Sequence, residues 1–102
     1  MERSILYKSQ TVEDMELDYY IIADDISKKH CNLESYGVRI IKTVCSEGGG
    51  KSIDSSQINN IFYRRSDIES FMELIVRNEV TPITLRDVVE DYIADSISGC
   101  AV

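Results

Sequence analysis

The spacing of apolar residues changes near the middle of this 102-residue chain, and the change restricts the folds it can adopt. In residues 5–45, apolar residues tend to recur at every second position, which is the pattern of strands with one buried face. In residues 66–93 they recur every three to four positions, the pattern of amphipathic helices. Because strands come first and helices last, without β-α-β alternation, we expect an α+β fold.

The first half of the chain predicts three strands and leaves a fourth segment open. The segments typical of strands are residues 5–12, 17–24 and 36–45. Residues 52–63 are ambiguous, because Ile58, Ile61 and Phe62 have helical spacing while two consecutive asparagines after Ile58 are poor helix formers. The preceding strand needs a partner, so we interpret residues 57–63 as a short returning strand.

The second half predicts two helices. Ser66 and Glu69 form a capping box at the start of the first helix, and Asn78 is suited to end it. Thr84 and Asp87 form a variant of that box before the second helix. The apolar stripe of the first helix is Ile68, Phe71, Met72 and Ile75, and that of the second is Leu85, Val88, Val89, Tyr92 and Ile93.

These elements together predict the architecture. We expect a meander of three to four antiparallel strands, packed on one face by two C-terminal helices. The length fits a single domain, which we place at residues 1–95, with residues 96–102 as a frayed tail.

Charge and hydropathy narrow the expected partners. The net charge of −7 repels a phosphate polyanion, so neither nucleic acid nor an anionic membrane is an expected partner. The sequence contains no apolar stretch of the length that a signal peptide or a membrane span needs. We therefore expect a cytoplasmic protein.

The cysteine and histidine residues do not predict a metal or catalytic site. The three cysteines, Cys31, Cys45 and Cys100, are widely spaced, and the one histidine, His30, adjoins the first of them. A zinc site would need these scattered ligands to converge, and it stays open only as an alternative. Side chains of adjacent residues diverge in an extended chain, so His30 and Cys31 do not form a base–nucleophile pair. We expect no metal, no cofactor and no enzymatic activity.

A glycine-rich segment resembles a phosphate-binding loop. Residues 45–52 match G-x-x-x-x-G-K-[ST] at every fixed position except the first, where Cys45 replaces glycine. The residues that would contact a nucleotide are Gly48, Gly49, Gly50, Lys51 and Ser52. Glu47 would put a negative charge in the site, and no clear helix pattern follows it. We therefore expect a hairpin turn here, with nucleotide binding as the alternative function.

Tyrosine content indicates a binding surface instead. The chain has six tyrosines and no tryptophan, and tyrosine suits half-buried positions because its ring is apolar and its hydroxyl tolerates water. If both helices cover one face of the sheet, the other face carries Tyr20, Ile22, Arg39 and Ile41. Such a patch favours self-association or a protein partner. We expect a non-enzymatic protein-interaction or regulatory module, which could act as a homodimer.

Several segments between residues 36 and 93 carry a family likeness. They are Tyr36-Gly-Val-Arg-Ile-Ile-Lys42 with the glycine-containing turn after it, Glu69, Leu74 and Ile75, and the stretch from Asn78 to Ile93. With them the chain resembles a family of small uncharacterised proteins of clostridia and related Firmicutes, and the likeness extends to the Tyr19-Tyr20 strand. Since that family is a domain of unknown function, the resemblance implies a bacterial cytoplasmic source and supplies no activity and no catalytic residues.

Overall fold

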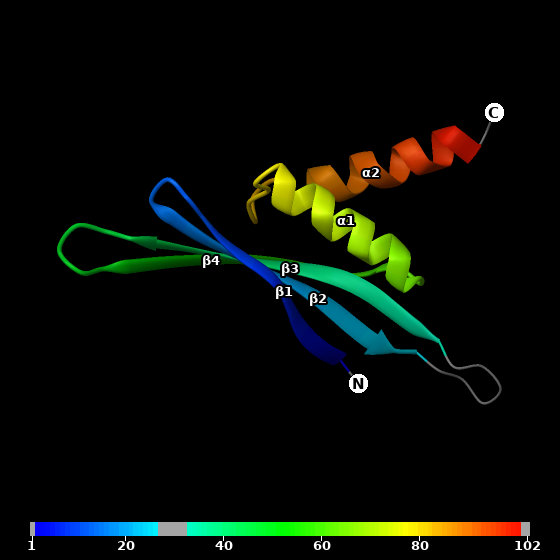
Figure 1. Ribbon diagram of the computed structural model, residues 1–102, viewed down its shortest axis with the longest axis horizontal. Helices are drawn as coiled ribbons and strands as arrows, with labels where there is room; N and C mark the ends of the chain where they lie inside the picture. The colour runs from blue at the N-terminus through cyan, green and yellow to red at the C-terminus, as the bar shows by residue number, and fades with distance from the viewer. Residues whose placement is uncertain (1, 27–32, 101–102) are drawn as a thin grey trace.

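The computed structural model of the chain describes residues 2–26 and 33–100, with side chains through residue 94. Its elements are β1 (Glu2–Val12), β2 (Met15–Asp25), β3 (Glu34–Cys45), β4 (Lys51–Phe62), α1 (Arg65–Arg77) and α2 (Leu85–Cys100). The strands form one antiparallel sheet in the order β1-β2-β3-β4, and both helices lie on one face of it (Figure 1). The predicted α+β meander with two C-terminal helices is confirmed.

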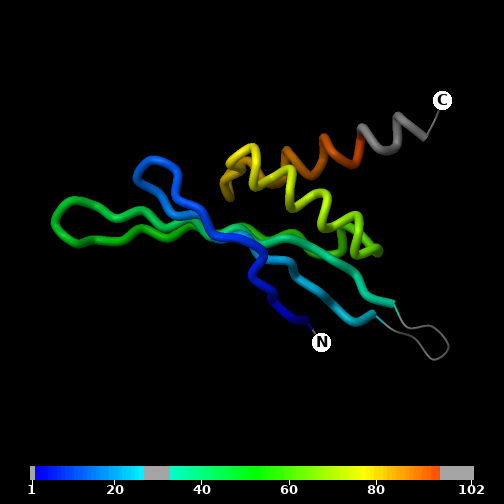
Figure 2. Tube along the Cα trace, in the orientation of Figure 1, coloured from blue at the N-terminus to red at the C-terminus, as the bar shows by residue number. Residues whose placement is uncertain are grey.

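The molecule is elongated and flat. Its principal extents are 55 × 35 × 16 Å and its radius of gyration is 15.4 Å, against about 13 Å for a compact domain of this length. The ends of the sheet at the β1–β2 and β3–β4 turns extend past the helices (Figure 2). The helices therefore cover only part of the sheet.

The core lies between the sheet and α1, and alternation along the strands sets which side chains enter it. Alternate residues of β2 and β3 face the helices: Leu17, Tyr19, Ile21, Ala23, Tyr36, Val38 and Ile40. They pack with the predicted stripe of α1 and with Leu85 and Val89 of α2, and all of these side chains are buried. The residues of α2 farther along, Tyr92 and Ile93, are more exposed.

Strand β4 is longer than predicted, because it begins directly after the glycine turn and spans Lys51–Phe62. A register shift also explains how the three apolar residues with helical spacing, Ile58, Ile61 and Phe62, all contact the core. Ile58 pairs with Val38 and Phe62 pairs with Tyr36, so that three residues of β4 lie opposite Gly37 alone. Consecutive residues of a regular strand point to opposite faces, whereas the extra residues of this bulge let both Ile61 and Phe62 pack against the core, as Ile58 does. The ambiguous segment is therefore a bulged strand.

The predicted N-terminal cap of the first helix differs from the structure. Helix α1 begins at Arg65 after the extended residue Arg64, and within the described residues no side-chain cap hydrogen bond is formed at this N-cap. Instead, Arg65 and Glu69 form an ion pair at 3.1 Å across the first turn. The prediction of a capping box at Ser66 is therefore wrong. Before α2, the Thr84 hydroxyl donates to the Thr81 carbonyl at 3.3 Å. Helix α2 continues through Cys100, and residues 101–102 lie outside the described part of the chain.

Helix α1 ends in a Schellman motif one residue later than expected. The Glu79 amide donates to the Val76 carbonyl at 3.1 Å, and the Val80 amide donates to the Ile75 carbonyl at 3.0 Å. The left-handed residue of this motif is Glu79, with φ of 55°, and not Asn78, with φ of −90°. Glycine is the residue usually found at that position because it has no Cβ to clash there.

We predict that Glu79→Gly raises the free energy of unfolding by about 0.5–1 kcal/mol. Relief of the left-handed conformation is worth about 1–2 kcal/mol, and the extra freedom of glycine in the unfolded chain offsets about 0.5–1 kcal/mol of it. Urea unfolding with an unchanged m-value measures the gain. Glu73→Gly, inside α1, is the matched control and should lose about 1 kcal/mol; a loss of stability in Glu79→Gly would contradict the prediction.

Candidate functional site

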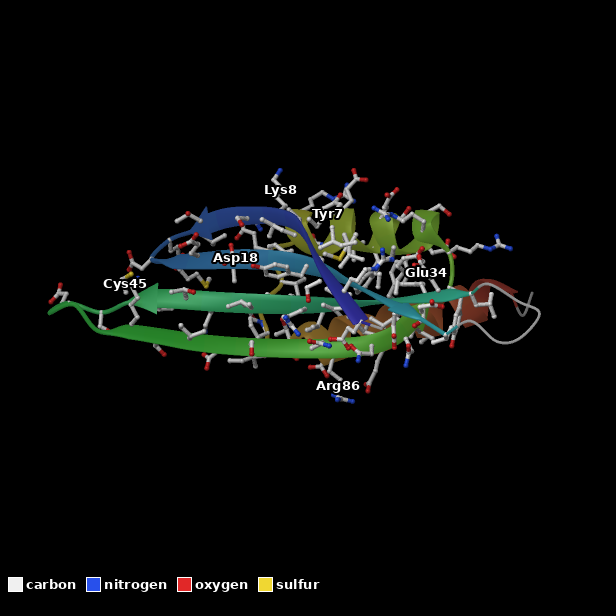
Figure 3. All side chains as sticks on the ribbon, turned by 90° about the horizontal axis from the view of Figure 1, so that it is seen from below. Tyr7, Lys8, Asp18, Glu34, Cys45 and Arg86 are labelled. Atoms are coloured by element: carbon white, nitrogen blue, oxygen red, sulfur yellow. The ribbon has the colours of Figure 1, made fainter. Side chains whose placement is uncertain are left out.

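A cleft of about 320 Å³ lies between β1 and the last turns of α1. Its lining residues come from these two elements and the turn after the helix: Tyr7, Lys8, Gln10, Glu73, Val76, Arg77 and Glu79. The volume is at the lower end of the range for ligand sites. Figure 3 shows Tyr7 and Lys8 at the outer edge of the sheet, on β1.

A β-bulge builds the strand side of this cleft. Leu6 pairs with Tyr20 and Lys8 pairs with Tyr19, which leaves Tyr7 without a partner on β2. In a regular strand, consecutive side chains point to opposite faces. The bulge instead lets both Tyr7 and Lys8 line the cleft, which is the re-aiming of side chains for which bulges are known.

Hydrogen bonds hold the floor of the cleft in place. The Gln10 amide nitrogen donates to the Val76 carbonyl at 2.9 Å and contacts the Tyr19 hydroxyl at 3.2 Å. The Tyr19 hydroxyl donates to the Val80 carbonyl at 2.9 Å. Burial raises the pKa of Tyr19, so its phenol stays protonated as a donor. Two strands are thereby joined to the end of α1, and the cleft has a fixed shape.

Four charged side chains surround the cleft, two of each sign. Lys8 and Arg77 are cationic, while Glu73 and Glu79 are anionic. Within the described part of the chain, none of the four belongs to an ion pair. Their charges are therefore available to a ligand that carries both a cationic and an anionic group.

The cleft was not predictable from the sequence. Glu73 and Arg77 are one helical turn apart, and this spacing was visible in the sequence. The bulge at Tyr7 was not visible, because it depends on how β1 pairs with β2. No motif in the sequence links residues 7–10 with residues 73–79.

The surface predicted for a partner is only partly open. Tyr20, Arg39 and Ile41 lie on the face opposite the helices and are half-buried, but Ile22 is 1 % exposed and is not available for contact. Figure 3 shows why: the first half of β1 crosses over β2 and β3 on that face.

A polar network joins the outer strands across this face. The Glu2 carboxylate of β1 accepts hydrogen bonds from Gln57 at 3.3 Å and Asn59 at 3.4 Å, both on β4. Arg39 lies between them and donates to Gln57 at 2.7 Å and Ser4 at 3.4 Å. Because side chains of the first and last strands meet, the sheet is strongly curled here, and its predicted apolar patch is closed by polar groups.

The glycine-rich segment forms a hairpin turn. The Ser46 amide donates to the Gly50 carbonyl at 2.7 Å, and Gly48 and Gly49 have φ of 94° and 92°. Lys51 and Ser52 are the first residues of β4, antiparallel to β3. A phosphate loop needs a helix N-terminus at this place. Gly48, Gly49, Gly50, Lys51 and Ser52 are therefore not arranged as a phosphate-binding loop.

The described residues contain no group of three or more side chains suited to hold a metal ion. Cys45 is exposed with a free thiol. His30 and Cys31 lie outside the described residues, as does the side chain of Cys100. Over the part of the chain that the structure covers, no helix is long and apolar enough to cross a membrane.

The fold and the cleft define a small α+β protein with a curled four-stranded meander, a helix layer on one face and a charged cleft between outer strand and first helix. A model of the family of unknown function DUF6514 matches residues 1–95, and the chain belongs to that family. The expected likeness to a domain of unknown function is thus confirmed at the level of the family. No curated protein and no solved structure matches the chain.

Proposed function

We propose that this protein is a non-enzymatic interaction module that associates with a second copy of itself through the free edge of β4. The supporting observation is the open edge of this strand: β4 is 12 residues long and, among the described residues, pairs with β3 alone. An unpaired strand edge presents a row of amide and carbonyl groups to another chain. The setting we propose is the bacterial cytoplasm, as the sequence predicts.

The residues that offer these groups follow from the hairpin. Ser46 and Gly50 are hydrogen-bonded at the turn, and bonded and non-bonded pairs alternate along an antiparallel ladder. Ile53, Ser55 and Gln57 therefore occupy non-bonded positions opposite β3. Their amide and carbonyl groups point away from the sheet.

The edge of β4 has few of the devices that keep strand edges apart. Natural edge strands carry charges, proline or bulges against pairing. Lys51 and Asp54 are the charged residues of β4, the strand contains no proline, and its bulge lies beyond Ile58. Strand β1, at the other edge, is interrupted near its middle by the bulge at Tyr7. We therefore assign association to β4 and not to β1.

A second copy fits this edge without charge conflict. Antiparallel pairing centred on Ser55 sets Ile53 opposite Gln57 of the partner subunit and Lys51 opposite Asn59 of the partner subunit. No like charges then face each other, and the side chain of Ile53, which is 65 % exposed, packs against the partner strand.

The test is the mass in solution over a roughly hundredfold range of concentration. We predict a shift from 11.6 kDa towards twice that mass, measured by light scattering with reductant present, because the exposed Cys45 could otherwise crosslink the copies. Ser55→Pro removes an outward amide without breaking the β3–β4 ladder, and it should abolish the shift.

Thr11→Pro is the matched control, because Thr11 lies in the same kind of outward position on β1 and should leave association unchanged. Circular dichroism checks that both variants fold. A wild-type mass of 11.6 kDa throughout the range would overturn the proposal.

A further inference from the structure

We propose that the cleft between β1 and α1 binds an extended segment of a partner protein, one that carries a basic and an acidic residue two positions apart. The inference rests on the proposed role as an interaction module, but it uses a different surface from the β4 edge.

The charges on the helix wall set the spacing. Glu73 and Arg77 are one turn apart on α1 and both line the cleft, so they lie about 6 Å apart along the helix axis. In an extended chain, side chains on the same face are two residues apart and about 6.6 Å from each other. A basic residue opposite Glu73 and an acidic residue opposite Arg77 are therefore both satisfied by one extended segment.

The other wall supports the same ligand. Lys8 on β1 adds a second cation, and Glu79 adds a second anion beyond the end of the helix. The lining of the cleft also includes Val76 and Tyr7, and Tyr7 is 39 % exposed. These apolar groups can pack against the aliphatic stems of a long charged side chain.

The mixed charge also argues against other ligands. A polyanion would meet Glu73 and Glu79, and a polycation would meet Lys8 and Arg77. A chain with alternating signs meets neither repulsion. Since the cleft is open to solvent, an extended segment can reach the charged side chains that line it.

The test compares short synthetic peptides by NMR titration of the full chain. The matched peptide is acetyl-Thr-Arg-Val-Glu-Val-Thr-amide, and the control of identical composition, acetyl-Thr-Val-Arg-Glu-Val-Thr-amide, makes the two charges adjacent. In the control they point to opposite faces. We expect the matched peptide to bind about three- to fivefold more tightly and to shift the amide signals of Tyr7, Lys8 and Arg77.

The peptide affinities of two α1 variants distinguish binding in the cleft from a general effect of charge. Arg77→Glu should weaken the matched peptide about tenfold and make a peptide with arginine at both charged positions the better ligand. Arg65→Glu makes the same change of charge on an exposed arginine at the other end of α1 and should leave the affinity within about twofold.

Equal affinity for the two peptides of identical composition would overturn the inference. An equal loss of affinity in Arg77→Glu and Arg65→Glu would also overturn it, as would NMR signal shifts confined to β4. The outcome is independent of self-association, because the titration can be repeated in Ser55→Pro. If that variant binds the peptide, the proposed peptide site in the cleft is supported even though β4 does not pair with a second copy. If the wild type self-associates but does not bind the peptide, the proposed peptide site is contradicted and the proposed self-association is not.

Discussion

Gly37→Ala is expected to destabilise the protein by about 3 kcal/mol or more. A Cβ atom placed on Gly37 would lie 2.2 Å from the Ile58 carbonyl oxygen and 2.8 Å from the Asn59 Cα atom. Both are backbone atoms, so no side-chain rotation relieves the collision. Strands β3 and β4 would have to separate where the bulge brings them together.

The cause of this close approach is the uneven pairing at the bulge. Three residues of β4 lie opposite Gly37, and Asn60 among them has φ of 58°. The extra backbone folds over the glycine and brings the Ile58 carbonyl against it. The curl that carries Asn59 towards Glu2 of β1 begins at the same place.

Urea unfolding of Gly37→Ala measures the effect, and Gly50→Ala is the matched control. A Cβ atom on Gly50 would meet nothing closer than the Ser46 side chain at 3.8 Å, so this control should change stability by less than about 0.5 kcal/mol. If Gly37→Ala lost less than about 1 kcal/mol, β4 could shift away cheaply, and the bulge would not be the rigid feature described above.

The buried face of each main strand and helix could be predicted from the sequence, because it depends on local periodicity. Leu17, Tyr19 and Ile21 are buried towards the helices as alternation indicates, and Ile68 and Phe71 are buried as the helical stripe indicates. In each case, a side chain's face depends on its position in its own element. Such information is present in a single sequence.

The curl of the sheet and the cleft were not predictable in this way. Ile22 is on the face opposite the helices, as alternation predicts, yet it is 1 % exposed because β1 crosses over that face. The bulges at Tyr7 and near Asn60 are properties of strand pairing. No residue type marks either position as a bulge in advance, and the cleft between β1 and α1 depends on the first of them.

The helix ends show a similar limit. The sequence around Ser66 fits a capping box, but the chain leaves β4 at Phe62 and enters the helix at Arg65. The ion pair with Arg65 then occupies the carboxylate of Glu69 that the box requires. Glu79 takes the left-handed conformation although Asn78 suits it better, because Val80 must reach the core. Tertiary packing decides such boundaries over local preference.

Phe71→Ala is expected to lower the free energy of unfolding by about 3–5 kcal/mol. Phe71 is completely buried, and its ring lies 5.6 Å from that of Phe62 and 5.0 Å from that of Tyr92. The Phe62 and Tyr92 rings are 5.7 Å apart and nearly perpendicular. The three rings join β4, α1 and α2, so removal of the central one leaves a cavity where three elements meet.

The same aromatic cluster holds α2 to the rest of the fold. A double-mutant cycle distinguishes the contact between the two rings from the free-energy cost of the cavity that each substitution leaves. Tyr92→Ala removes a half-buried ring and should cost less than Phe71→Ala. The pair should couple by about 0.5–1.5 kcal/mol, the value expected for edge-to-face aromatic contacts. Ile83→Ala, at a side chain 77 % exposed, is the control and should change stability by less than about 0.5 kcal/mol. Additive losses would mean that α2 is held by Leu85 and Val89 and not by the aromatic cluster.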